Sequence, residues 1–216
     1  MDNTTTVTTQ TKPRTKANTS SRVNVRFLAV TAMLSAVAYV LMFLDFSVPF
    51  MPGFIKMDLS ELPALIGAFS MGPSCGIFVC LIKNLIHLTI TSTGGVGELS
   101  NFILGVAFVL PAGLIYKFKK TRKSALIGAL TGMVVMGVLS VFSNYFLTYP
   151  IYYNFMSKEA ILSAYQAIVP WAKIDSILQC LVCFNMPFTM LKGLFSVFIT
   201  MLVYKPLSPI LKGRQS

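Results

Sequence analysis

The chain has 216 residues, of which 55% are hydrophobic and only 12% are charged, and its formal net charge is +11. This composition excludes an ordinary soluble domain and indicates an integral membrane protein. The positive charge does not indicate nucleic-acid binding, because the basic residues stand in short clusters beside apolar segments, as the loop charges that orient a membrane protein do. The length allows one membrane domain of about six spans and no additional soluble enzyme domain.

Apolar segments predict an all-α integral membrane protein whose membrane domain covers residues 25–212. We expect a disordered cytoplasmic tail at 1–24 and a short tail at 213–216. The first apolar run is interpreted as a retained span and not as a signal peptide, because no cleavage site follows it. Six transmembrane helices are expected at about 27–44, 60–72, 75–91, 98–116, 124–147 and 186–204.

The distribution of basic residues predicts the orientation of these spans. Six spans place the N-terminus, the basic turn at 117–123 and the C-terminus on the same side of the membrane, and this side holds most of the lysines and arginines. Because basic loops stay in the cytoplasm, both termini are expected to be cytoplasmic. The second span is too short for a straight crossing and resembles the broken helices that border transporter sites.

The last span carries one polar face on an otherwise apolar helix. We expect this helix to begin at Asn185, a good N-cap, with Pro187 in its first turn. Lysine inside an apolar span is expensive and indicates a functional site, although Lys192 could instead snorkel to the interface. The polar residues recur every three or four positions and therefore share this face: Asn185, Thr189, Lys192, Ser196 and Thr200.

Three other spans carry polar side chains at the same expected depth, late in the third span, early in the fourth and late in the fifth: Asn84, His87, Glu98, Asn101 and Asn144. Together with Thr189 and Lys192 they predict a pocket in the outer half of the membrane. Its ligand would have flat apolar surfaces and hydrogen-bonding edges. The apolar loop at 47–58 is expected to cover this pocket as a lid, or else to anchor the protein at the interface.

Other classes of function are less well supported by the residues. An intramembrane enzyme would need a catalytic pair, but Glu98 has no acidic partner in a neighbouring span and His87 has no second metal ligand. We expect no metal site, and we expect the cysteines, including Cys180 and Cys183, to be small buried side chains. A self-sufficient carrier would need polar groups continuing through the inner half of the spans.

Five segments in this order and spacing resemble the riboflavin-specific S component, the substrate-binding subunit, of energy-coupling factor (ECF) vitamin transporters. The resemblance covers about residues 27–212 and includes Phe54–Pro63, Lys83-Asn-Leu-Ile-His87, Gly95–Phe102, Asn144-Tyr-Phe and Pro187–Gly193. It implies a six-helix ECF S-component fold in a bacterial cell membrane that captures riboflavin from outside. It also implies partnership with a membrane coupling subunit (the T component) and two cytoplasmic ATPases, consistent with a chain that has no nucleotide-binding motif.

The resemblance also implies roles for individual residues. Asn144 and Lys192 match family positions that hydrogen-bond the isoalloxazine and ribityl groups. Ala32 and Ala36 match an Ala-x-x-x-Ala pattern that meets the coupling subunit, so the small-residue face formed by Ala29, Ala32 and Ala36 would be a partner face; spacing alone fits internal packing equally well.

Two positions depart from the family pattern. Thr189 stands where relatives carry Asn, and Glu98 replaces an apolar or small residue, so a related flavin such as FMN, or another vitamin, is an alternative ligand. On chemistry and position alone, we expect apolar contacts with the ring from Phe54, Met57, Phe102 and Tyr145. Riboflavin would be the transported ligand, and no cofactor is expected.

Overall fold

The computed structural model describes residues 25–48, 51, 55–91, 94–154, 157–168 and 176–211, with side chains described as far as residue 203. In chain order its elements are α1 (Val25–Phe43), β1 (Phe46–Ser47), β2 (Lys56–Met57), α2 (Glu61–Met71), α3 (Pro73–His87), η1 (Leu88–Ile90), α4 (Val96–Phe118), α5 (Arg122–Ser143), η2 (Asn144–Thr148), α6 (Tyr149–Tyr152), α7 (Lys158–Ile168), α8 (Ile177–Cys180), η3 (Leu181–Asn185) and α9 (Met186–Leu211).

Continuous helical segments confirm the all-helical membrane class. Five are long and apolar enough to cross a membrane, and they cover 25–43, 73–90, 96–118, 122–152 and 177–203. The segment α2 has only 11 residues, which confirms the prediction of a short second helix. A straight crossing needs about 20 residues, so the 11 residues of α2 are too few to form one by themselves.

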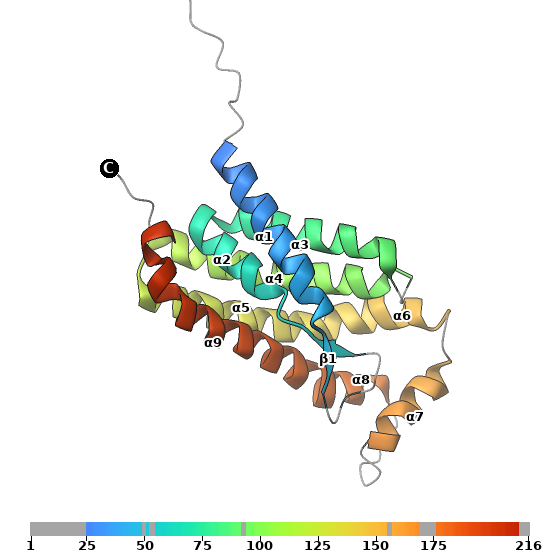
Figure 1. Cartoon of the computed structure of the whole chain (residues 1–216). Helices are drawn as coiled ribbons and strands as arrows, with labels where there is room; N and C mark the ends of the chain where they lie inside the picture. Colours follow the sequence, from blue (N-terminus) through green and yellow to red (C-terminus); the bar gives the residue numbers. More distant parts are fainter. Residues whose placement is uncertain are drawn as a thin grey trace, which may run out of the picture.

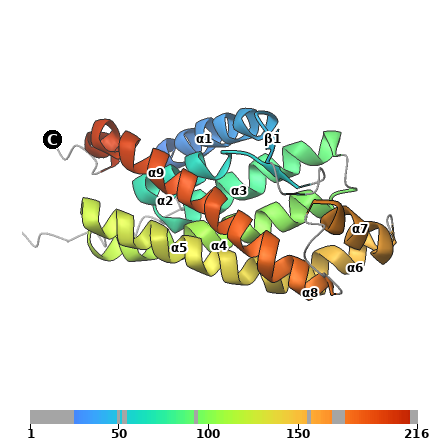
Figure 2. The same ribbon diagram turned by 90° about the horizontal axis from the view of Figure 1, so that it is seen from below.

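The helices form one elongated bundle (Figure 1). Helix α4 packs against α3 and α5, and α9 packs against α5 and α2. The start of α1, the turn between α4 and α5 and the end of α9 lie at one end of the bundle, while the β1–β2 hairpin, α6, α7 and α8 lie at the other (Figures 1 and 2). We call these the packed end and the hairpin end.

Small residues bring the helix backbones of the bundle close together. A Cβ atom added at Gly132 of α5 would lie 2.2 Å from the carbonyl oxygen of Phe108 on α4, and one at Gly128 would lie 2.8 Å from that of Ala112. Glycine is the residue that permits this approach, since any side chain would collide with backbone. Among the cysteines, only Cys183 is exposed, contrary to the prediction.

The strands β1 and β2, at the two ends of the segment 46–57, pair with each other in antiparallel orientation. Phe46 pairs with Met57 and Ser47 pairs with Lys56. An ion pair of 2.9 Å between Asp45 and Lys56 ties the two sides together. Phe54, one of the expected ligand contacts, lies outside the described residues.

The predicted start of the last helix is wrong. The helix begins at Ile177, where the side chain of Ser176 caps it by accepting a hydrogen bond of 3.3 Å from the backbone nitrogen of Leu178. Asn185 is therefore in the helix interior. Proline lacks an N–H and collides with the carbonyl four residues earlier, and a helix can accommodate it by widening locally. Here a π-helical turn, η3, ends at Asn185, two residues before Pro187.

The fifth span also has a π-helical turn shortly before a proline, and it extends beyond its predicted end. The π-helical turn η2 follows α5 and comes just before Pro150, after which α6 continues to Tyr152. A proline at this position favours a helix boundary in sequence, because the preceding residue is usually not helical. The two π-helical turns explain why both boundaries differ from those expected.

Candidate ligand-binding site

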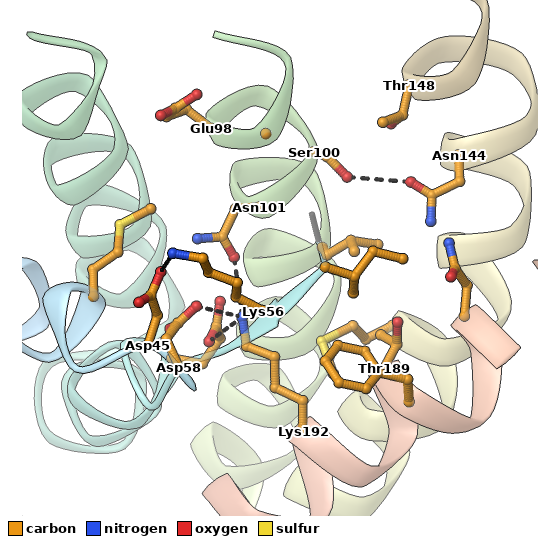
Figure 3. Close-up of a pocket in the computed structure, with 18 of the residues that line it drawn as sticks. Asp45, Lys56, Asp58, Glu98, Ser100, Asn101, Asn144, Thr148, Thr189 and Lys192 are labelled. Carbon is orange, nitrogen blue, oxygen red and sulfur yellow. Dashed lines mark hydrogen bonds and ion pairs between the residues drawn. The ribbon is translucent and has the colours of Figure 1, made fainter. Parts of the chain in front are cut away.

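A cavity of about 650 Å³ lies at the hairpin end of the bundle, within the range of about 300 to 1,000 Å³ typical of small-molecule sites. Figure 3 shows its polar side chains pointing toward one another from several elements. Residues of α1, the hairpin, α2, α3, α4, both π-helical turns and α9 line it: Met42, Asp45, Ile55, Lys56, Asp58, Glu61, His87, Gly94, Gly97, Glu98, Ser100, Asn101, Leu104, Met136, Asn144, Thr148, Tyr149, Tyr152, Asn185, Phe188, Thr189 and Lys192.

Lys192 points into this cavity from α9. Its ammonium nitrogen lies 3.0 Å from Asp58 Oδ2, 3.1 Å from Glu61 Oε2 and 3.3 Å from Asn101 Oδ1 (Figure 3). Only 13% of the side chain is exposed. The alternative of a snorkelling lysine is therefore wrong, because the charge is held inside the protein.

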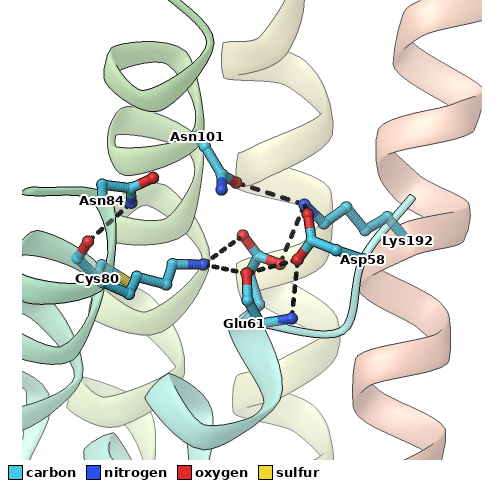
Figure 4. A network of polar contacts seen from close by, with 8 residues as sticks. Asp58, Glu61, Cys80, Asn84, Asn101 and Lys192 are labelled. Atoms are coloured by element: carbon cyan, nitrogen blue, oxygen red, sulfur yellow. Dashed lines mark hydrogen bonds and ion pairs between the residues drawn. The ribbon is translucent and has the colours of Figure 1, made fainter. Parts of the chain in front are cut away.

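A second lysine completes a chain of alternating charges. Lys83 of α3 is fully buried; its Nζ lies 3.1 Å from Glu61 Oε1 and also donates to Ser60 Oγ. Figure 4 shows Glu61 beside Asp58 and Lys192 in this network. The four side chains Lys83, Glu61, Lys192 and Asp58 together carry no net charge. Buried charges of this kind are tolerated only when they are paired, and removing one member leaves another uncompensated.

Asp58 follows β2 directly and so connects the hairpin to α9. Its Oδ1 accepts hydrogen bonds from the backbone nitrogen, at 2.8 Å, and the hydroxyl of Ser60. Burial by itself would raise the pKa of this carboxyl group, but the charges of Lys192 and Lys83 and the bonds from Ser60 outweigh burial and lower the pKa to about 2. Asp58 is therefore ionised at any physiological pH.

A second polar cluster lies where the end of α3 meets the start of α4. His87 Nδ1 lies 2.7 Å from Glu98 Oε1, and the hydroxyl of Thr91 donates to Glu98 Oε2 at 2.9 Å. Gly95 in turn donates its backbone N–H to Thr91 Oγ1 at 3.1 Å. These contacts fix the turn between the two helices and satisfy a carboxylate that is almost completely buried.

The two π-helical turns supply the third group of polar side chains. Asn144 and Thr148 come from η2, and Asn185 comes from η3. The hydroxyl of Ser100 donates to Asn144 Oδ1 at 3.4 Å (Figure 3). A π-helical turn rotates the residues on either side relative to a regular helix, and such turns are frequent at functional sites.

Six of the predicted ligand contacts lie on the wall of this one cavity: His87, Glu98, Asn101, Asn144, Thr189 and Lys192. They come from α3, α4, η2 and α9, as the expected convergence of four helices requires. Their direct contact with a ligand stays a prediction.

Four other predicted contacts do not line the cavity. Asn84 is buried and donates from Nδ2 to the carbonyl of Cys80 at 2.7 Å, so it faces its own helix. Met57 is buried, and Phe102 packs against the main apolar core. Tyr145 is 45% exposed and packs edge-on against Phe146. Its position one residue after Asn144 points it out of the bundle, which sequence spacing alone did not show.

Several cavity residues were missed from the sequence, above all Asp58, Glu61, Ser100, Tyr149 and Asn185. A signal for the acids existed. Two lysines in apolar spans need counter-charges, and the segment between the hairpin and α2 supplies carboxylates.

The fold and the cavity together define a helical membrane protein that encloses a small-molecule site near one end of its bundle. The family model described as "ECF transporter, substrate-specific component" matches residues 26–204. The chain therefore belongs to the family of substrate-specific components of ECF transporters. Membership makes it a multi-pass protein of the bacterial cell membrane and a transport subunit, not an enzyme in its own right.

Curated relatives and a solved structure agree with this family. The chain is 33% identical over 185 residues to the riboflavin transporter RibU of Staphylococcus aureus (strain TCH60), covering 86% of this chain and 92% of that one. It is 34% identical over 196 residues to the riboflavin transporter FmnP of Bacillus subtilis (strain 168), covering 89% and 97%. A structure described under "Structure and mechanism of the S component of a bacterial ECF transporter" superposes with a TM-score of 0.69 at 31% identity, covering 88% of this chain and all of that one.

Proposed function

We propose that this protein binds riboflavin from the extracellular side and delivers it to the cell as the substrate-specific subunit of an ATP-driven ECF transporter. The observation that carries the proposal is the single cavity shared by Lys192, Asn101 and Asn144. The relatives of similar length named as riboflavin transporters support the choice of vitamin.

The chemistry of the cavity suits a flavin. Riboflavin has a flat tricyclic ring with carbonyl and ring-nitrogen edges and a chain of hydroxyl groups. Apolar surface for the ring is available from Met42, Leu104, Met136 and Phe188. Hydrogen-bonding groups lie on more than one wall, at Lys192, Asn101 and Asn144, so both edges of a ring and its hydroxyl chain can be matched.

The charges on the wall favour riboflavin over FMN. In the described part of the chain, the lining carboxylates are Asp45, Asp58, Glu61 and Glu98, whereas the lining lysines are Lys56 and Lys192. Both lysines are paired with carboxylates. A phosphate carries about −1.5 to −2 charges at neutral pH and would meet more negative than positive groups here.

The membrane topology proposed for this function has α2 as a short sixth crossing beside the five long segments, with both termini in the cytoplasm. The basic residues of the α4–α5 turn support this orientation. The hairpin end, with its cavity, then faces outward, where the vitamin is captured.

The proposed partners are the membrane coupling subunit and two cytoplasmic ATPases of an ECF transporter. Ala29, Ala32 and Ala36 of α1 are all exposed, so this small-residue face is available to a neighbouring helix and does not pack inside the bundle. A self-sufficient carrier is the second candidate, and uptake measured with and without the partner subunits distinguishes the two.

Titration of the detergent-purified protein with riboflavin tests the proposed ligand. Flavin fluorescence is expected to fall on binding, and the protein is expected to bind FMN at least tenfold more weakly. Equal affinity for both would contradict the charge argument. Unchanged riboflavin fluorescence, together with a preparation free of bound flavin, would contradict the proposed function.

A further inference from the structure

Three buried polar side chains form a closed ring of hydrogen bonds at the cavity wall. Tyr165 donates its hydroxyl to Asn185 Oδ1 at 2.8 Å, and Asn185 Nδ2 donates to the hydroxyl of Tyr149 at 3.4 Å. The hydroxyls of Tyr149 and Tyr165 are 2.7 Å apart. Since the Tyr165 hydrogen is used on Asn185, Tyr149 is the donor to Tyr165.

The three residues stand at different places relative to the cavity. Asn185 and Tyr149 line it, whereas Tyr165 is fully buried behind them on α7. Helix α7 lies at the hairpin end, outside the long apolar segments, as Figure 2 shows. Its inner face is held by Ile161 and Tyr165, which belong to one apolar cluster with Tyr149.

This ring gives the amide of Asn185 a fixed orientation. An asparagine side chain has one oxygen and two N–H groups, and the ring uses the oxygen and one N–H. The other N–H is engaged by neither tyrosine. Burial raises the pKa of Tyr165, and its hydroxyl therefore stays protonated and keeps donating.

A purely structural role does not explain where this amide lies. Asn185 is in the π-helical turn η3, which brings it to the same wall as Thr189 and Lys192 of α9. An apolar residue would fill a helix interface without any need for three linked polar groups. An amide that lines a cavity and is held in one orientation by hydrogen bonds to its neighbours is instead pre-organised to bind a ligand.

We propose that Asn185 determines specificity by donating a hydrogen bond to an acceptor on the bound flavin, and that Tyr165 is a positioning residue that acts through Asn185. The inference rests on the proposed riboflavin site and adds to it a contact and a supporting residue from α7. Pre-organised groups of this kind strengthen binding because less orientation is lost when the ligand arrives.

A double-mutant cycle tests the proposal with riboflavin as the probe. The variants are Asn185→Ala, Tyr165→Phe and the combination, and dissociation constants are measured by quenching of flavin fluorescence. Losing one hydrogen bond is expected to weaken binding roughly 5- to 10-fold for Asn185→Ala. Tyr165→Phe is expected to weaken it about threefold alone and to add almost nothing in the Asn185→Ala background.

Two further readouts separate positioning from a general structural effect. The visible absorption bands of bound riboflavin are expected to shift in the same direction in Asn185→Ala and Tyr165→Phe, because both change hydrogen bonding to the ring system. Tyr39→Phe is the matched control: Tyr39 packs against Phe43 on α1 and does not line the cavity. It should change neither affinity nor spectrum. If Asn185→Ala fails to fold, Asn185→Asp, which keeps the oxygen that faces Tyr165, is expected to lose at least as much affinity.

The outcomes are distinct. Wild-type affinity in Asn185→Ala, or effects that multiply in the double variant, would overturn the inference while leaving the riboflavin site intact. Lower melting temperatures with unchanged affinities would show a structural role only and would overturn it as well. A wild-type protein that does not bind riboflavin would overturn the proposed function, and the inference with it.

Discussion

The two ends of the bundle are built on opposite principles. At the packed end, glycines and alanines put helix backbones in contact: a Cβ atom on Gly113 would lie 3.0 Å from Pro73, and one on Gly76 would lie 2.7 Å from the carbonyl of Ala64. At the hairpin end, two π-helical turns and a hairpin leave a cavity of about 650 Å³. The packed end brings its helices into close contact, whereas the hairpin end keeps a cavity between its elements.

The buried charges follow the same division. Asp58, Glu61, Lys83 and Glu98 are all buried, and each lies at or beside the cavity. Paired charges hold the cavity open because their hydrogen-bonding geometry is specific, whereas apolar groups would collapse into the space. We therefore expect a larger side chain to destabilise the packed end, and the loss of a charged group to disturb the hairpin end.

Helix α9 passes through both ends and shows the difference within one element. Four members of its polar stripe are buried, and the side chain of the fifth, Lys192, is only 13% exposed. Only the first three members, Asn185, Thr189 and Lys192, line the cavity, while Ser196 and Thr200 are buried farther along the helix. The stripe indicates which face is internal, and the neighbouring helices decide where that face encloses a site.

The largest effect is expected from adding volume at the packed end. Gly132→Leu would drive a side chain into the carbonyl of Phe108, and overpacking of this kind costs about 3 kcal/mol or more. We expect a severe loss of folded yield and a much lower melting temperature in detergent. Val134→Leu on the same helix is the control, because Val134 is 47% exposed. A Gly132→Leu variant as stable as the wild type would show that this end tolerates volume.

The next largest effect is expected from removing the central charge of the cavity. Lys192→Met is expected to weaken riboflavin binding about 10- to 100-fold, since a hydrogen bond from a charged group contributes about 1.5 to 3 kcal/mol. It should also lower the melting temperature, because Asp58 would lose its counter-charge. Affinity and melting temperature are measured on the same purified protein.

The double variant Lys192→Met with Asp58→Asn separates these two consequences. It restores the charge balance while Lys83 and Glu61 keep each other. The melting temperature is expected to recover and the affinity to stay low. Recovery of affinity would mean that Lys192 only stabilises the hairpin and does not contact the ligand.

A smaller effect is expected from protonating Asp58. A pKa lowered from 3.8 to about 2 corresponds to about 2 to 3 kcal/mol of stability. Because the folded-state pKa is the lower one, this stability is fully present above pH 4 and is lost as the pH falls toward 2. Melting temperatures measured between pH 2 and pH 5 should show the loss, and Asp58→Asn should reduce it. Equal pH dependence in both proteins would contradict the assignment.

The smallest effect on the purified protein is expected on the outer surface of α1. Ala32→Leu adds volume to an exposed face, so the melting temperature and riboflavin affinity should not change. Riboflavin uptake by cells that contain the partner subunits should nevertheless fall, because close helix contact needs small residues. Met33→Leu, on a neighbouring exposed position, serves as the control. Loss of binding in Ala32→Leu would place that face inside the fold.

The sequence was most informative where a pattern repeats. Three- and four-residue spacing placed Asn185, Thr189 and Lys192 on one internal face, and hydropathy found the five long segments and the short α2. These signals depend only on helix periodicity and on the cost of polar groups in lipid. They are independent of how the helices are arranged.

The sequence was least informative where local rules were broken. Pro150 and Pro187 look like helix boundaries, but in each case a π-helical turn lets the helix continue. The same turns decide that Asn144 faces the cavity while Tyr145 faces outward. Pairing across the fold was also not visible: Asp58 and Lys192 are 134 positions apart, and no local pattern links them.

The absorption spectrum of the detergent-purified protein tests most directly whether the hairpin end is a flavin site. We expect visible flavin bands in the purified protein, and a released molecule with the mass of riboflavin after denaturation. A colourless protein that also leaves the fluorescence of added riboflavin unchanged would contradict that claim.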